Sequence, residues 1–457
     1  MIRALLLRLS VSVAALAAVS VPALANPAVV VDADSGQVLY SQDATRPWYP
    51  ASITKLMTVY VALNAVREGR MTMDTPMIVS ARAARMPPSK MGFRPGTEVT
   101  LDNALKMLMV KSANDLAITV AEGVDGSVEG FAGEMNRTAA KLGMQDSHFV
   151  NPNGLPAADH YTSARDMAIL ARALYADFPD EAGLYDIGAL ELNGRIIANH
   201  NGLLGRYPGA DGMKTGFTCA AGFNVVASAT HGSRHLIAVV LGSPSAKERN
   251  ARAADLLENA FGSSSGSGSL ESLSPVGGSP PDMHGTACAG HHGNYVADLE
   301  DDSAAINVSG SDKTGGRNFF LFGGTQSSGA SGMEIASRER PVFTPEHVYI
   351  GPAPGWTGAV AGASPGTKRG KTDANAEPAA TTAYAQQKAK INGNPLSAED
   401  PYAQPLRLVE EPAKKGAKAK VAHVKPHTKL AQSEAKAPQP PVKPKGKIKP
   451  KKPATNP

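Results

Sequence analysis

The stretch PASITKLMT, residues 50–58, opens a segment in which Ile53, Leu56 and Tyr60 recur at helical spacing. Pro50 stands just before this segment, as is typical of a helix start, so we predict a helix over residues 52–66. Ser52 and Lys55 would then share one helix face, one turn apart, with Ser52 at the positive end of the helix dipole. A lysine whose pKa is lowered can activate such a serine as a nucleophile, although the pattern also fits an N-cap serine followed by a solvated lysine.

Strand-like runs occur towards both ends of residues 27–261, and helical patterns fill the middle. Residues 28–33 and 38–40 read as one hairpin, and residues 222–230 and 235–241 read as a second. Further helices are predicted over residues 101–110, 115–124, 128–142, 162–175 and 245–261. If the terminal strands pair, the result is an α/β fold of the layered α+β kind, with an antiparallel sheet flanked by helices.

The first 25 residues have the features of a secretory signal peptide. Arg3 and Arg8 supply positive charge, residues 9–24 are mostly apolar, and residues 23–25 read Ala-x-Ala at a cleavage site. An uncleaved anchor is the alternative, but this apolar run is shorter than the roughly 20 residues that span a bilayer. We therefore expect export to the periplasm or cell envelope, with a mature protein that is soluble or peripheral to the membrane.

The composition changes after Phe261. Residues 262–269 read GSSSGSGS, residues 262–365 are expected to be a linker and weakly structured region, and residues 366–457 form an Ala/Pro/Lys-rich basic tail expected to be disordered. The net charge of +5 comes mainly from this tail, so the charge does not indicate nucleic-acid binding. The tail is either a solvated segment or a contact site for anionic envelope polymers or lipid head groups.

The chain has only two cysteines, Cys219 and Cys288, which is too few for a disulfide framework. In an oxidising compartment the two can pair, and otherwise they are unpaired thiols. The sequence leaves both possibilities open.

Two further motifs carry groups suited to chemistry. Ser112-Ala113-Asn114 lies between two predicted helices, where a hydroxyl and an amide can point into one cleft. Lys214-Thr215-Gly216 precedes the strand-like run at residue 222 and offers a cation, a hydroxyl and a small residue against which a substrate can lie. A second copy, Lys313-Thr314-Gly315, lies outside the predicted globular region, so we favour the first.

These three motifs in this order, with FVNPNGL at residues 149–155 and NGLL at residues 201–204, closely resemble the low-molecular-mass penicillin-binding proteins. That family comprises the D-alanyl-D-alanine carboxypeptidases of serine peptidase family S11. The resemblance covers about residues 27–261 and implies a β-lactamase/DD-peptidase-like fold. It also implies peptidoglycan stem peptides as substrates, β-lactam antibiotics as inhibitors, and no metal or cofactor.

The resemblance implies a role for each motif residue. Ser52 would be acylated with Lys55 as its base, while Ser112 would relay a proton and Asn114 would hold the substrate amide. Lys214, Thr215 and Arg249 would bind the terminal carboxylate of the substrate, and Gly216 would let it lie against the backbone. The backbone N–H groups of Ser52 and Phe217 would form the oxyanion hole, each worth roughly 3 kcal/mol in the transition state.

The chain departs from the family pattern in two respects. Phe217 stands where relatives often carry histidine or threonine, which puts substrate preference and deacylation rate in question. The family's small β-rich second domain and terminal amphipathic helix are not evident after Phe261.

Three other functions remain open in principle. A DD-endopeptidase would use the same residues, and an inactive peptidase fold could serve as a wall-binding scaffold. A class A β-lactamase is disfavoured because Ala189 occupies the position of the glutamate that deacylation needs.

Overall fold

The computed structural model describes residues 26–263, 266, 268–289 and 330–362, all of which belong to one compact unit, Met1–Glu377. The predicted signal peptide and the basic tail lie outside the described residues. Within the described ranges, no helix has both the length and the apolar character needed to cross a bilayer.

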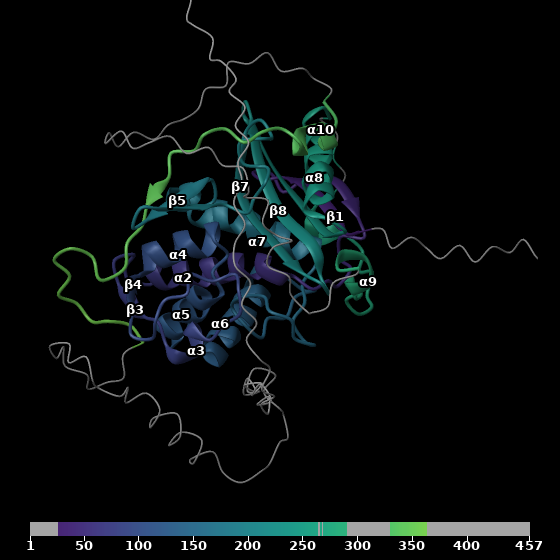
Figure 1. The fold of residues 1–457 in the computed structure, drawn as a ribbon. Coiled ribbons are helices and arrows are strands. Elements are labelled where there is room, and N and C mark those ends of the chain that lie inside the picture. Colours follow the sequence, from purple (N-terminus) through teal and green to yellow (C-terminus); the bar gives the residue numbers. More distant parts are fainter. Residues whose placement is uncertain (1–25, 264–265, 267, 290–329, 363–457) are drawn as a thin grey trace, which may run out of the picture. The chain divides into compact units, whose positions relative to one another are not determined.

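An antiparallel sheet of five strands organises the molecule (Figure 1). Its order is β2-β1-β9-β8-β7, so the first and last strands of the domain are neighbours, as the sequence predicted. Strand β1 pairs with β9 in the register Val30↔Ala238, and β8 forms a hairpin with β9. The strands are β1 (Ala28–Asp32), β2 (Val38–Gln42), β7 (Ala210–Thr218), β8 (Gly222–His231) and β9 (Arg234–Ser243).

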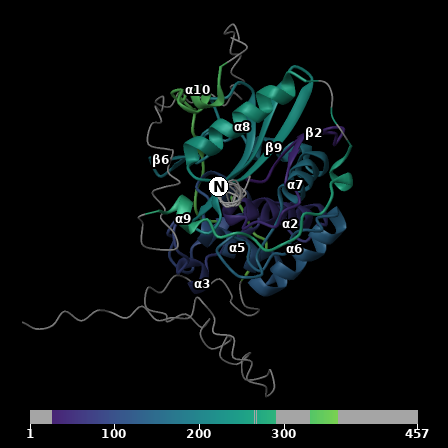
Figure 2. The same ribbon diagram turned by 90° about the vertical axis from the view of Figure 1, so that its right-hand side faces the viewer.

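Both faces of this sheet are covered, because its strands are apolar on both sides. In β1, Val29 and Val31 join the larger hydrophobic core, whereas Ala28 and Val30 join a smaller core on the opposite face. This alternation follows from the two-residue period of a strand. The smaller core lies under α8 (Ala246–Phe261), which Figure 2 shows along one face of the sheet.

The larger core is built mainly by helices on the other face. They are α2 (Lys55–Arg67), α3 (Ala81–Ala84), α4 (Leu101–Val110), α5 (Asn114–Asp125), α6 (Val128–Leu142) and α7 (Ala164–Asp177). Serine or threonine side chains cap four of them, because Ser80, Thr100, Ser127 and Ser163 accept from backbone N–H groups at the starts of α3, α4, α6 and α7. The predicted helices are therefore confirmed to within two or three residues at each end.

Short elements that the sequence did not reveal complete this part of the fold. They are the 3-10 helices η1 (Ala51–Thr54) and η2 (Pro179–Leu184), and the strands β3 (Pro76–Ile78), β4 (Glu98–Thr100), β5 (Ala189–Leu192) and β6 (Arg195–Ala198). Strands of three or four residues give too little alternation to be recognised in a sequence. The β3–β4 and β5–β6 pairs form separate small sheets beside the helices.

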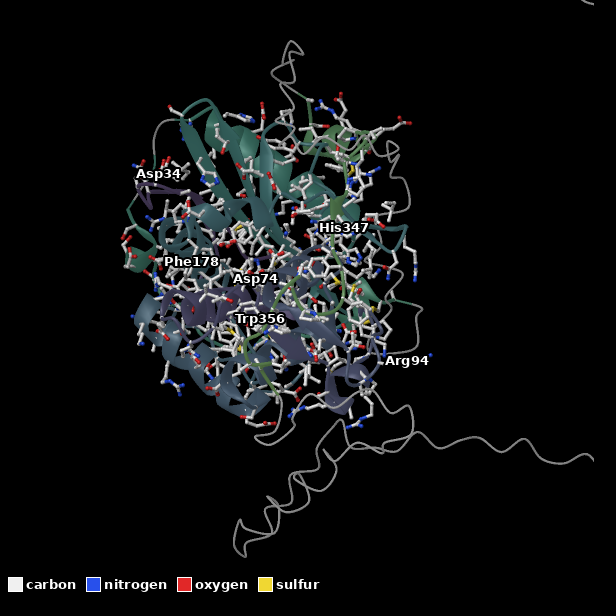
Figure 3. All side chains as sticks on the ribbon, turned by 90° about the vertical axis from the view of Figure 1, so that its left-hand side faces the viewer. Asp34, Asp74, Arg94, Phe178, His347 and Trp356 are labelled. Carbon is white, nitrogen blue, oxygen red and sulfur yellow. A yellow bond between two sulfur atoms is a disulfide. The ribbon has the colours of Figure 1, made fainter. Side chains whose placement is uncertain are left out.

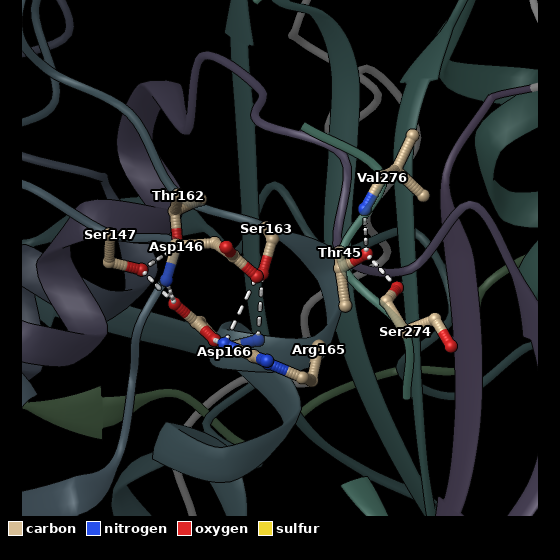
Figure 4. Close-up of polar contacts among 9 residues, drawn as sticks. All are labelled: Thr45, Asp146, Ser147, Thr162, Ser163, Arg165, Asp166, Ser274 and Val276. Atoms are coloured by element: carbon tan, nitrogen blue, oxygen red, sulfur yellow. Dashed lines mark hydrogen bonds and ion pairs between the residues drawn. The ribbon is translucent and has the colours of Figure 1, made fainter. Parts of the chain in front are cut away.

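The described residues after 261 pack back onto this core. Thr45 donates a hydrogen bond to the carbonyl of Ser274 and accepts one from the amide of Val276, as Figure 4 shows. This part includes η3 (Leu270–Ser272) and α9 (His284–Ala287). The change in composition at Phe261 therefore does not coincide with the end of tertiary contacts.

Residues 330–362, here called the strap, form a second returning segment. The strap begins with α10 (Gly332–Ala336), which packs on α8, and continues through β10 (Glu346–His347), which pairs in parallel with β5. It then reaches β3, where the amide of Ala361 donates to the carbonyl of Pro76 at 2.8 Å. Figure 3 faces this side, with His347 and Trp356 of the strap labelled.

Candidate active site

Ser52 lies in the second position of η1, directly before α2, rather than inside the α-helix itself. The preceding residue, Ala51, has a φ of +49°, a left-handed conformation that residues with a side chain adopt only under constraint. Asn224 of β8 holds the approach to this turn, because its side-chain amide donates to the carbonyls of Tyr49 at 2.9 Å and Pro50 at 3.0 Å. The strained turn thus leaves Ser52 half-exposed at the head of a buried helix.

Lys55 links the first two motifs. Its Nζ donates to Ser52 Oγ at 2.9 Å and to Asn114 Oδ1 at 2.8 Å. It also donates to the backbone carbonyl of Asn153 at 2.8 Å, and its side chain has no exposed surface. The alternative of a solvated lysine beside an N-cap serine therefore does not describe this site.

Ser112 and Asn114 lie where α4 passes into α5. Ser112 has a φ of +60° and is 1% exposed, and its Oγ has no hydrogen-bond partner among the described residues. Asn114 opens α5 and donates from Nδ2 to the carbonyl of Pro87 at 3.0 Å. The amide of Asn114 is thereby held in one orientation, with its oxygen on Lys55.

Lys214, Thr215 and Gly216 lie inside β7, whereas the sequence placed them before a strand. Strand β7 has few apolar residues, so its sequence does not look like that of a strand, although every residue from Gly212 onward is buried. The Cβ position of Gly216 would be 2.7 Å from the backbone nitrogen of Ser52, so only glycine allows this approach. The third motif therefore lies directly alongside the first.

The side chains of this triplet are almost wholly buried. Lys214 is 2% exposed and donates to the carbonyl of Thr215 at 2.9 Å, and Thr215 is 1% exposed. Phe217 is also buried, and its ring stacks on Phe223 with the centroids 4.1 Å apart. The Phe217 side chain thus belongs to the core, which leaves its backbone as the part suited to contact a substrate.

The loop at residues 151–155 has a role that the sequence did not assign. Its Asn153 carbonyl accepts from Lys55, and a Cβ on Gly154 would be 1.8 Å from the carbonyl oxygen of Ala51. Within the loop, the amide of Gly154 donates a hydrogen bond to Asn151 Oδ1 at 2.7 Å, which closes the turn. The turn-forming composition of the loop was visible in the sequence, but its contact with the turn that carries Ser52, here called the serine turn, was not.

His160 supports the turn that carries Ser52 by bonding Thr54, the residue directly before α2. Its Nδ1 accepts from the amide of Val150 at 3.0 Å, so the proton lies on Nε2, which donates to Thr54 Oγ1 at 2.9 Å. Burial, with a smaller contribution from His148, lowers the pKa of His160 to about 3. His160 is therefore an uncharged structural group that fixes the residue before Lys55.

Arg249 lies in the first turn of α8, has no exposed surface, and donates from Nε to Asn250 Oδ1 at 3.1 Å. It lies close enough to His200 to act on it electrostatically, as Lys214 also does. Burial first, and then Lys214, Lys111, Arg249 and Arg340, lower the pKa of His200 well below its usual value. His200 and Arg340 were not among the residues that the sequence indicated.

Cys219 and Cys288 form a disulfide, with Cα atoms 5.4 Å apart. Cys219 directly follows β7, and the nearby amide of Met283 donates to the carbonyl of Ala220 at 3.0 Å. The disulfide therefore ties the end of the motif strand to α9. Of the two possibilities that the sequence left open, the structure has the bonded one.

The remaining sequence features lie elsewhere. The second Lys-Thr-Gly copy, at residues 313–315, falls outside the described residues. Across the described ranges, no group of three histidine, cysteine or acidic side chains is arranged to hold a metal ion.

Comparison with known proteins identifies the family. Residues 15–245 match the Peptidase S11 model, described as D-alanyl-D-alanine carboxypeptidase. The D-alanyl-D-alanine carboxypeptidase DacF of Bacillus subtilis (strain 168) is 38% identical over 241 residues, which are 52% of this chain and 62% of that protein. DacA of Escherichia coli (strain K12) is 37% identical over 241 residues, which are 51% of this chain and 60% of that protein.

Solved structures agree with this assignment. Penicillin-binding protein 5 from Haemophilus influenzae matches with a TM-score of 0.51 and 35% identity, over 52% of this chain and 71% of that one. DacD from Francisella tularensis also matches with a TM-score of 0.51, at 31% identity over 52% of this chain and 70% of that one. The match spans only about three fifths of the length of the first curated relatives. The chain belongs to the D-alanyl-D-alanine carboxypeptidase family, Peptidase S11.

Proposed function

We propose that this protein is a serine D-Ala-D-Ala carboxypeptidase that removes the terminal D-alanine from peptidoglycan stem pentapeptides. The observation that carries the proposal is the convergence at Ser52, where Lys55 Nζ lies 2.9 Å from Oγ and Gly216 of β7 lies against the backbone. A hydroxyl next to a buried amine is the arrangement that nucleophilic catalysis requires. The family and the curated relatives, all D-alanyl-D-alanine carboxypeptidases, support the same reaction.

In the first half of the reaction, Lys55 acts as the base after it has given up one of its three protons. Ser52 Oγ attacks the carbonyl carbon of the penultimate D-Ala while its own proton passes to Lys55 Nζ. The backbone N–H groups of Ser52 and Phe217 stabilise the oxyanion of the tetrahedral intermediate. The C–N bond then breaks, and Ser112 relays a proton to the departing amine of the terminal D-Ala. An ester between Ser52 and the shortened peptide remains.

In the second half, a water molecule attacks the ester carbonyl, and its proton is taken up by the same Lys55–Ser112 pair. The C–O bond to Ser52 breaks, which releases the tetrapeptide and restores the hydroxyl. Asn114 holds the amide of the bound peptide, while Lys214, Thr215 and Arg249 bind its terminal carboxylate.

A β-lactam would acylate Ser52 in the same way, because its strained amide occupies the place of the D-Ala-D-Ala bond. The test is incubation of the purified protein with a fluorescent penicillin, followed by mapping of the adduct by mass spectrometry, beside a Ser52→Ala variant. A stable adduct on Ser52 that the variant lacks is expected. Intact penicillin with no adduct would instead favour the wall-binding scaffold on an inactive peptidase fold.

A DD-endopeptidase that cleaves cross-links remains the second enzymatic candidate, because it would use the same residues. Product analysis with monomeric and dimeric muropeptides separates the two, since a carboxypeptidase releases free D-alanine from monomers. Slow deacylation is expected with penicillin, because Ala189 occupies the sequence position at which a class A β-lactamase would carry its deacylating glutamate.

We also propose that the protein works outside the cytoplasm, in the periplasm or cell envelope. The signal-peptide pattern of residues 1–25 supports export, and the Cys219–Cys288 disulfide suits an oxidising compartment. The contact of the basic tail with anionic envelope polymers or lipid head groups stays a prediction from the sequence.

A further inference from the structure

The strap is fitted closely to the surface between α8 and β5. Arg206 donates from Nε to the carbonyl of Arg338 at 2.6 Å. A Cβ on Gly205 would be 2.5 Å from the side chain of Pro341. A Cβ on Gly188 would be 2.1 Å from the ring of Phe343. Because these two glycines make room for the strap, the contact is a packed interface rather than a loose crossing.

The strap inserts one charge into the domain. Arg340 is 4% exposed, and its guanidinium donates from Nη1 to the carbonyl of Asn199 at 2.8 Å and from Nη2 to the carbonyl of Asn201. The two carbonyls stand on either side of His200. A planar guanidinium that holds two carbonyls fixes the backbone between them, which a lysine could do less well.

The backbone held by Arg340 is connected to the third motif. Asn201 donates from Nδ2 to the carbonyl of Gly212 at 2.9 Å, two residues before Lys214 in β7. His200 is 4% exposed, and its Nδ1 has no hydrogen-bond partner among the described residues. Hydrogen bonds thus join the strap to the turn at residues 199–201, and that turn to β7 at Gly212, two residues before Lys214.

Four cations lie close enough to this turn to act on His200. The charged groups that act on His200 are Lys214 from β7, Lys111 before Ser112, Arg249 from α8 and Arg340 from the strap, all of them cations. Together with burial they lower the pKa of His200, which keeps the imidazole uncharged. Cations that converge in a buried place repel one another, and a bound anion relieves that repulsion.

We propose that the strap completes the carboxylate-binding subsite, with Arg340 as a positioning residue that holds the 199–201 turn against Lys214 and adds positive charge to the subsite. The proposal rests on the proposed function, because the anion in question is the terminal carboxylate of the D-Ala-D-Ala substrate. Arg340 lies outside the segment that matches the family model, residues 15–245. Substrate recognition in this chain therefore depends on a segment that follows the catalytic motifs by more than a hundred residues.

The test measures binding separately from chemistry, in the full chain carrying Ser52→Ala. An N-acylated D-Ala-D-Ala dipeptide and its C-terminal amide are titrated by calorimetry against this protein and against versions that also carry Arg340→Met, Arg340→Lys or Arg338→Met. Arg338 is the matched control, since it is the same residue type in the same strap and only its backbone carbonyl is used in the contact described above.

The expected result is a selective loss. Arg340→Met should weaken binding of the acid by about tenfold and that of the amide by less than about twofold, while Arg340→Lys keeps most of the preference for the acid. In the enzyme with Ser52 intact, the same loss should appear in KM rather than kcat. Arg338→Met should leave both peptides unaffected.

Equal weakening of acid and amide would show that Arg340 has only a structural role and would overturn the proposal, as would unchanged binding of both. Thermal melting of each variant checks the fold. If Arg340→Met melts below the assay temperature, Arg340→Gln, which removes the charge but keeps an N–H donor, takes its place, and it should show the same selective loss of binding for the acid. Failure of the proposed function has a different signature, because the protein with Ser52 intact would then neither form a penicillin adduct nor release D-alanine.

Discussion

Gly216 of β7 and Ser52 of η1 approach so closely that a Cβ on the glycine would be 2.7 Å from the serine nitrogen. The same Cβ would be 3.0 Å from the carbonyl oxygen of Pro50, so backbone surrounds it on more than one side. Backbone atoms cannot rotate out of the way as the end of a flexible side chain can. The spacing of the strand and the serine turn is therefore set by the absence of a side chain at position 216.

Gly216→Ala should push β7 away from the serine turn. Because a displacement of about 1 Å in a catalytic site can cost roughly 10²-fold in rate, we expect acylation by a chromogenic cephalosporin to fall by at least about tenfold. Stopped-flow measurement of the acylation rate tests this. Gly183→Ala is the control, since a Cβ there meets nothing within 4 Å. An unchanged rate in Gly216→Ala would show that the cleft does not need this approach.

Lys55→Met should remove the base while keeping the length and apolar stem of the side chain. We expect the acylation rate to fall by about 10²- to 10⁴-fold, the usual worth of a positioned general base. The change also leaves the Asn114 and Asn153 oxygens without this donor, at a cost of about 1–3 kcal/mol in folding free energy. Lys141→Met, on the exposed side of α6, is the control. Acylation within about threefold of wild type would rule out Lys55 as the base.

His160 should make the fold sensitive to acid. Its pKa is about 3 in the folded protein, mainly through burial, against about 6.5 for a histidine in an unfolded chain. Between these two pKa values the unfolded chain binds a proton that the folded protein does not. The contribution of His160 to the free energy of unfolding is therefore fully present above about pH 6.5 and is lost as the pH falls towards 3, by up to about 1.4 kcal/mol per pH unit.

His160→Gln, which does not titrate, should give a shallower loss of stability over this pH range. Urea unfolding at pH 7.0, 6.0 and 5.0 measures the slope. His200, whose pKa is also lowered by burial and by nearby cations, should retain its own contribution in the same direction. Parallel pH curves for His160→Gln and wild type would contradict the assignment.

Loss of the disulfide should destabilise the protein without removing the catalytic groups. A bond that closes a loop of 69 residues contributes about 4 kcal/mol by the loop-entropy estimate. We expect Cys288→Ser to lower the unfolding midpoint in urea, and dithiothreitol to do the same to the wild-type protein. Dithiothreitol should have no further effect on the variant. A reductant effect of equal size on both would mean that the bond is not its target.

Much of the fold could be predicted because its signals are local. Helices such as α4 and α6 show the apolar period of their buried face, and the β8–β9 hairpin shows two apolar runs around a turn. Strand β7 was missed because Gly212, Lys214 and Gly216 break the apolar pattern. Those residue types are needed there for the close approach to Ser52, so function overrides the signal for a strand.

The sequence by itself determined the family resemblance and the order of the three motifs, since each depends on residue types and spacings along the chain. Only the tertiary structure decided that Asn153 bonds Lys55, that Cys219 pairs with Cys288, and that Arg340 reaches the turn beside Lys214. These contacts join residues separated by 98, 69 and more than a hundred positions. No local pattern encodes them, because they arise only when the packed core brings distant segments together.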